Sequence, residues 1–177
     1  MTDYFGRQTS LLNLMNQDPR CLEHVKTQNE ELCLAAVRND GLCLVFVLEK
    51  TPLICMKAVK QNGLALMYVP VQTKELCLDA VSQNGMSLEF VKEVDEEIEL
   101  LAVMQCSHAL QFVKKQTDLL CKAAINTNYH ALQFVNDKTI ALCAFAVKRN
   151  REALFYVPDV IKTEVLISCA QTLVDNL

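Results

Sequence analysis

The sequence contains no tryptophan, and only four of its 177 residues are glycine and four are proline. All-β domains need many tight turns, in which glycine and proline are favoured, so this scarcity favours helices joined by short connections. The net charge of -4 shows no surplus of lysine and arginine. A protein that simply coats nucleic acid needs such a surplus to displace counterions from phosphates, so the net charge argues against that class.

Long apolar runs are also missing. No stretch approaches the roughly 20 uninterrupted apolar residues of a membrane helix. The segment Met1–Gln8 contains Asp3 and Arg7 and has no apolar run of the kind found in a signal peptide. We therefore expect a soluble protein without a membrane partner, located in the cytoplasm or another aqueous, reducing compartment.

An internal repeat dominates the rest of the chain. Six blocks of similar sequence begin 22 residues apart: Leu32–Val47, Ile54–Val69, Leu76–Val91, Ile98–Val113, Leu120–Val135 and Leu142–Val157. A degenerate block, Ser10–Val25, precedes them in the same register, and a helix near Thr163–Leu177 follows a two-residue insertion. Stacked units bury apolar faces that one short unit cannot bury alone, so repetition at this period predicts a solenoid.

The predicted fold is all-α, a solenoid of about seven two-helix repeats plus a C-terminal helix. We expect one domain over 1–177, with a degenerate unit at 10–31 and a capping helix at 164–177. The regular units are 32–53, 54–75, 76–97, 98–119, 120–141 and 142–163.

Each unit carries local signals for two helices. The first helix should begin after a capping side chain, which is Asn29, Thr51, Thr73, Asp95, Thr117, Thr139 or, for the last helix, Thr163. It should end after about ten residues at a turn such as Asn62–Gly63 or Asn84–Gly85, residues that tolerate a left-handed cap. The apolar run that follows is only six or seven residues long, which predicts a short α- or 3₁₀-helix.

Several columns of the repeat hardly vary and indicate the core. One column holds only alanine, which lets neighbouring helices approach closely, and comprises Ala36, Ala58, Ala80, Ala102, Ala124 and Ala146. An aromatic column comprises Phe46, Tyr68, Phe90, Phe112, Phe134 and Tyr156. Such a column could stack nucleic-acid bases, but aromatic rings at one fixed phase of a solenoid are better explained by packing against each other inside it.

The unit, with its core xxLCLxAVxQNGxALxFV and a following linker VPxxxKTxxL, resembles the repeat called domain of unknown function 4116. The best matches are Ile54–Leu76 and Val157–Leu166, where the linker reads VPVQTKEL and VPDVIKTEVL. The resemblance implies an occurrence in giant viruses, amoeba-associated intracellular bacteria and some protists. If the protein comes from such a virus or bacterium, the resemblance implies an effector-like protein in the cytosol of the host cell. It implies no known catalytic residues.

The nine cysteines are interpreted as small apolar fillers in a reducing compartment. Adjacent helices lie about 8–10 Å apart, while a disulfide needs Cα atoms within about 7 Å, so a column of cysteines should not cross-link. No spacing typical of a metal site is present. His108 and His130 lie at the same phase, and Glu152 continues their column, but two histidines without a clear third ligand make a weak site. We expect no catalytic residue, cofactor or metal.

A solenoid binds through the columns that differ between its units. Four residues are apolar where other units carry polar side chains: Leu101, Met104, Phe145 and Phe155. We interpret them as a surface for a protein partner or for self-association, although end units could also bury them. The leading hypothesis is a non-enzymatic protein-binding or scaffolding module with no small-molecule substrate and no nucleic acid. A nucleic-acid-binding helical repeat is the alternative, and an enzyme with a site between repeats is a third.

Overall fold

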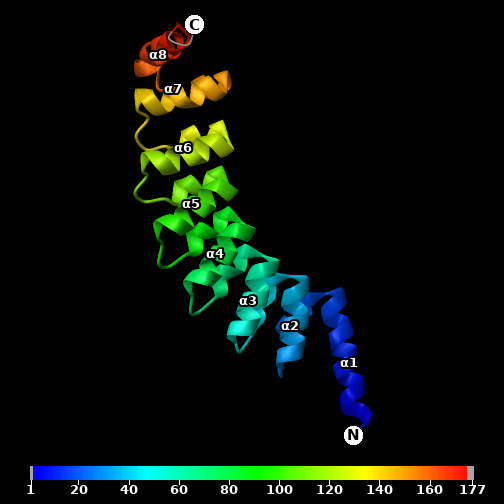
Figure 1. The fold of residues 1–177 in the computed structure, drawn as a ribbon. Helices are drawn as coiled ribbons and strands as arrows, with labels where there is room; N and C mark the ends of the chain where they lie inside the picture. Colours follow the sequence, from blue (N-terminus) through cyan, green and yellow to red (C-terminus); the bar gives the residue numbers. More distant parts are fainter. Residues whose placement is uncertain (1, 175–177) are drawn as a thin grey trace. The chain divides into compact units, whose positions relative to one another are not determined.

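The computed structural model describes the backbone of residues 2–174 and the side chains of residues 10–171. The fold is an all-α repeat solenoid, with 76% of the residues helical. Every element in the described part is an α-helix or a 3₁₀-helix, labelled η (Figure 1). The prediction of short paired helices at a period of 22 residues is confirmed.

The elements alternate regularly along the chain. The α-helices are α1 (Thr2–Gln17), α2 (Glu30–Asn39), α3 (Pro52–Gln61), α4 (Lys74–Gln83), α5 (Glu96–Gln105), α6 (Asp118–Thr127), α7 (Ile140–Arg149) and α8 (Lys162–Val174). The 3₁₀-helices are η1 (Pro19–His24), η2 (Gly41–Phe46), η3 (Gly63–Tyr68), η4 (Gly85–Phe90), η5 (Ser107–Phe112), η6 (Tyr129–Phe134), η7 (Arg151–Tyr156) and η8 (Asp159–Ile161).

The chain divides into two compact units, an N-terminal unit that ends at Val94 and a C-terminal unit that begins at Asp95. Within each unit, consecutive α-helices pack against one another, and consecutive η-helices form a second layer against them. In Figure 1 the α-helices of each unit lie side by side in chain order. The α layer and the η layer are therefore the two surfaces that each unit presents.

The predicted caps explain where six of the α-helices begin. In each, the side-chain oxygen of the cap residue accepts a hydrogen bond from the backbone N–H three residues later. The caps are Asn29, Thr51, Thr73, Asp95, Thr117 and Thr139. The prediction for Thr163 is wrong, because η8 runs directly into α8 and Thr163 lies inside that helix. Of the expected C-terminal helix 164–177, residues 175–177 lie outside the described part.

The turn between α and η does not use a left-handed residue, so that prediction is also wrong. Asn62 is extended, with φ −146° and ψ 112°, and no described residue has a positive φ. Asn62 instead accepts a hydrogen bond from the Leu64 N–H and thereby caps η3. Gly63 instead lies in close contact with the next repeat. A Cβ at this position would clash with the Ala80 carbonyl oxygen of the next α-helix.

The core lies between the two layers. The alanine column is fully buried, as are leucines of several η-helices, such as Leu44, Leu66 and Leu110. The aromatic column is half-buried rather than enclosed, as at Phe134 and Tyr156. The rings of this column therefore contribute to the surface as well as to the core.

Candidate functional site

Three glutamines bind neighbouring repeats together at the linkers. The Gln72 amide nitrogen donates to the carbonyl oxygens of Leu66 (3.4 Å) and Phe90 (2.9 Å). Its amide oxygen accepts from the Lys92 N–H (3.0 Å) and from the Cys77 thiol (3.6 Å). One side chain therefore satisfies backbone groups in two consecutive repeats, which would otherwise be left without partners.

The same bonds recur exactly two repeats away in each direction. Gln28 donates to Leu22 and Phe46 and accepts from Leu48, and Gln116 donates to Leu110 and Phe134 and accepts from Asn136. The intervening linkers carry a different residue. Lys50 donates to the Val47 carbonyl oxygen (2.6 Å), and Lys138 donates to those of Val135 (2.7 Å) and Gln133 (3.4 Å), all within the same repeat as the lysine. Bridged and unbridged linkers therefore alternate.

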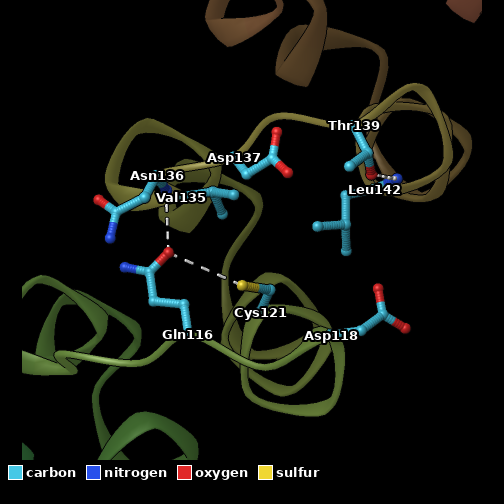
Figure 2. Close-up of a pocket in the computed structure, with 8 residues that line it drawn as sticks. All are labelled: Gln116, Asp118, Cys121, Val135, Asn136, Asp137, Thr139 and Leu142. Carbon is cyan, nitrogen blue, oxygen red and sulfur yellow. Dashed lines mark hydrogen bonds between the residues drawn. The ribbon is translucent and has the colours of Figure 1, made fainter.

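A groove lies between two linkers in each of the two units. A groove of about 440 Å³ lies at Lys50 in the N-terminal unit, with an apolar lining that includes Pro52, Met56, Pro70 and Val71. The equivalent groove in the C-terminal unit is smaller, about 250 Å³. Gln116 lies in that groove and bridges Asn136 and Cys121, as the dashed lines in Figure 2 show. The side chain that ties these repeats together is thus also part of the lining of the smaller groove.

Both grooves are lined by carboxylates. The larger one includes Glu75 and Asp79 together with Lys50. The smaller one includes Asp118 and Asp137, which are drawn in Figure 2. Asp118 is paired with Lys122 at 2.6 Å. Among the described residues, no group of three or more metal-ligating side chains is close enough together to hold an ion.

All nine cysteines are free thiols in the structure. Burial raises the pKa of the thiols in the main column, at Cys33, Cys55, Cys121 and Cys143. Burial also raises the pKa of Cys43, to about 11. The thiolate is the reactive form, so these buried thiols are protonated and unreactive near neutral pH.

The histidine column that was considered and rejected as a metal site forms aromatic contacts. His108 packs against Phe134, with ring centroids 5.1 Å apart. His130 stacks on Tyr129 (4.2 Å), and its Nδ1 lies 2.6 Å from the Tyr156 hydroxyl. Glu152 accepts a hydrogen bond from the Tyr129 hydroxyl, and this bond raises the pKa of Tyr129. The three groups that were considered as ligands are therefore engaged with aromatic partners.

The structure places the four predicted partner-binding residues on two layers. Leu101 and Met104 lie one turn apart on α5, where Leu101 is half-buried and Met104 is 58% exposed. Phe145 lies on α7 and is half-buried. Phe155 is 83% exposed but belongs to η7 in the other layer. The first three residues therefore share the outer surface of the α layer, and Phe155 does not belong to that surface.

The sequence analysis missed one residue of this surface. Leu119 lies on α6, between α5 and α7, and is 56% exposed. Its column in the repeat reads Glu31, Leu53, Glu75, Glu97, Leu119 and Ala141, so the change from glutamate to leucine was a signal in the sequence. We call the surface formed by Leu101, Met104, Leu119 and Phe145 the α5–α7 face.

The N-terminal unit has charged side chains at the equivalent places. The Met104 column holds Lys60 and the Phe145 column holds Asp79, and these two side chains form an ion pair at 3.5 Å. On the α5–α7 face, Phe145 instead lies beneath two cations. The Arg149 guanidinium is 4.6 Å from the ring centroid and the Lys122 ammonium is 5.8 Å from it. In these two columns the N-terminal unit thus carries an ion pair, where the C-terminal unit carries Met104 and Phe145.

Comparison with known proteins bears on the repeat itself. Three overlapping segments, 29–74, 51–94 and 73–116, match the model of the family described as domain of unknown function 4116. The chain carries repeats of this family over residues 29–116. Each matched segment of domain of unknown function 4116 spans two 22-residue units, the same distance that separates the bridging glutamines. The resemblance predicted from the linker and core motifs is confirmed.

No curated protein and no solved structure matches the chain. In the described part, none of the helices has the length and apolar character needed to cross a bilayer.

Proposed function

We propose that this chain is a protein-binding module that performs no chemistry, and that it binds through the α5–α7 face. The observation that supports this proposal is the exposure of Met104 and Leu119 beside Leu101 on adjacent helices. Contiguous apolar surface of this kind on a folded protein is typical of interaction sites, whereas single exposed apolar residues are common everywhere. The partner is another protein or a second copy of the chain.

The environment of Phe145 fits such an interface. Aromatic and arginine side chains are enriched among the residues that dominate binding energies. The Arg149 guanidinium stacked on Phe145 fixes both groups before a partner arrives, which lowers the entropic cost of binding. Nine free thiols, five of them in one column, support placing the module in a reducing compartment, including the cytosol of a host cell.

Site-specific photo-crosslinking tests this proposal. A photoreactive amino acid is introduced at Met104, and the matched control carries it at Leu48, which is 72% exposed in a linker of the N-terminal unit. We expect a defined adduct from Met104 in an extract of the source cells, and no adduct from Leu48. The adduct from Met104 should disappear when Leu119 is replaced by serine, because the exposed leucine contributes to binding more than to folding.

Two results would contradict the proposal. One is an adduct formed equally from Leu48 and Met104, which would indicate non-specific contact. The other is an adduct from Met104 that persists when Leu119→Ser and Phe145→Ser are combined in a protein with unchanged helical content by circular dichroism. In that case the interface would lie elsewhere.

A further inference from the structure

The α5–α7 face carries opposite charges at its two ends. The first turn of α5 is acidic, with Glu96, Glu97 and Glu99, and the last turn of α7 is basic, with Lys148 and Arg149. The apolar side chains of Leu101, Met104, Leu119 and Phe145 lie between them. Acidic residues near the start of a helix and basic residues near its end stabilise the helix dipole, so the signs alone are not unusual.

The acidic and the basic side chains lie on different helices of the face. The last turn of α5 has no basic residue, and the first turn of α7 has no acidic residue. Each helix therefore uses only one of its two favourable ends. The result is a surface with an acidic corner on α5, a basic corner on α7 and an apolar centre.

We propose that this face binds a second copy of the same chain, with the acidic first turn of α5 in each copy against the basic last turn of α7 in the other. This proposal rests on the proposed function, because it names the partner of the same face. A two-fold axis makes both contacts equivalent, since each copy offers the same patch to the other. A surface with opposite charges at opposite ends and an apolar centre is complementary to itself under such an axis.

The charged groups themselves support the pairing. Arg149 is exposed, and its interaction in the structure is with the Phe145 ring rather than with a carboxylate. Lys122, the other cation at that ring, is already paired with Asp118 at 2.6 Å. Glu99 occupies the position of the buried cysteine column, so Glu96 and Glu97 are the exposed carboxylates of the acidic corner.

The size of the face sets the expected strength of the dimer. Three helices of about 15 Å, spaced about 9 Å apart, give a face of roughly 400 Å² per copy. Interfaces with a total below about 1,200 Å² belong to weak, transient complexes, so the dimer should dissociate on dilution. We expect monomers at about 5 µM and a rising dimer fraction toward about 500 µM in sedimentation equilibrium.

Charge reversal tests the pairing directly on the full chain. Arg149→Glu alone and Glu96→Arg alone each place like charges together at both contacts, so each variant should dimerise about tenfold more weakly or worse. An equimolar mixture of the two variants restores both opposite-charge contacts and should form a heterodimer. The matched control is Arg38→Glu, which changes an exposed arginine in the last turn of α2 and should leave association unchanged.

Each outcome of this experiment decides the proposal. Recovery in the mixture supports it and also shows that both variants fold. Wild-type association by either single variant, or no recovery in the mixture, overturns it. A wild-type protein that stays monomeric at the highest concentration also overturns it. In that case the adduct from the photoreactive group at Met104 still decides the proposed function, because a different partner protein would appear in that adduct.

Discussion

Replacing Gly63 by alanine should be among the most damaging small changes in the N-terminal unit. An added Cβ would lie closer than 3.0 Å to the Ala80 carbonyl oxygen and 2.7 Å from the Ser87 hydroxyl. The carbonyl belongs to the backbone of α4, so it cannot rotate away, and α4 must separate from η3 by roughly 1 Å. Overpacking of this kind costs about 1–3 kcal/mol.

A second contribution comes from the hydrogen bond at the same position. The Gly63 N–H donates to the Gln83 side-chain oxygen at 2.6 Å, and the Cβ would also crowd that oxygen. Loss of this bond adds about 1 kcal/mol, so the free energy of unfolding should fall by about 2–4 kcal/mol in all. With a urea dependence of about 1–3 kcal/mol per molar, the midpoint of unfolding should fall by about 1–2 M. Circular dichroism at increasing urea concentration measures this shift.

A second variant separates close approach from backbone strain. If Gly63 were needed for a left-handed turn, asparagine would be tolerated much better than alanine, because it adopts that conformation readily. If close approach is the reason, Gly63→Asn should cost at least as much as Gly63→Ala. An asparagine variant of wild-type stability would therefore refute the reasoning, as would an alanine variant that is more stable than the wild type.

Three further predictions follow from the linkers and the core. Gln72→Ala should lower the free energy of unfolding by about 1–3 kcal/mol in urea titrations, since it leaves backbone groups of two repeats unpaired, while Gln111→Ala at an exposed position should have little effect. The Ser87 hydroxyl is buried without a hydrogen-bond partner among the described residues, so Ser87→Ala should preserve the thermal midpoint or raise it, and a clear decrease would show that the hydroxyl has a partner. Burial raises the pKa of Cys43 from 9.0 to about 11, so the folded state resists ionisation, and stability that is present below pH 9 should be lost as the pH rises toward 11. Urea titrations across that pH range should show a smaller loss for Cys43→Ala than for the wild type.

The fold could be predicted from the sequence because its signals are local and repeat many times. The cap side chains of Thr51 and Thr73 accept hydrogen bonds from backbone groups three residues away. Residue propensity and spacing were therefore sufficient to predict where these helices begin. The role of Gly63 could not be predicted in this way. The group that demands a glycine there is the Ala80 carbonyl, 17 positions along the chain, and only the stacking of repeats brings it close.

The candidate surface was predicted only in part, for a similar reason. Met104 and Leu101 were recognised because their columns hold polar residues elsewhere. Phe155 satisfies the same criterion, yet its place on η7 separates it from them. A column identifies a residue that differs, but the layer on which that residue lies depends on how the two helices of each repeat pack. The stacking of Phe145 on Arg149 also depends on where the two side chains lie, which cannot be inferred by comparing residues at the same position of each repeat.

The alternation of bridged and unbridged linkers limits how such an array can change its length. Removing one 22-residue unit would place two glutamine linkers next to each other, or two linkers that lack glutamine, at the junction. Removing or adding 44 residues would leave each linker beside the kind of neighbour it has now. The array can therefore be lengthened or shortened by two repeats at a time without disturbing this alternation. This is the spacing of the bridging glutamines Gln28, Gln72 and Gln116.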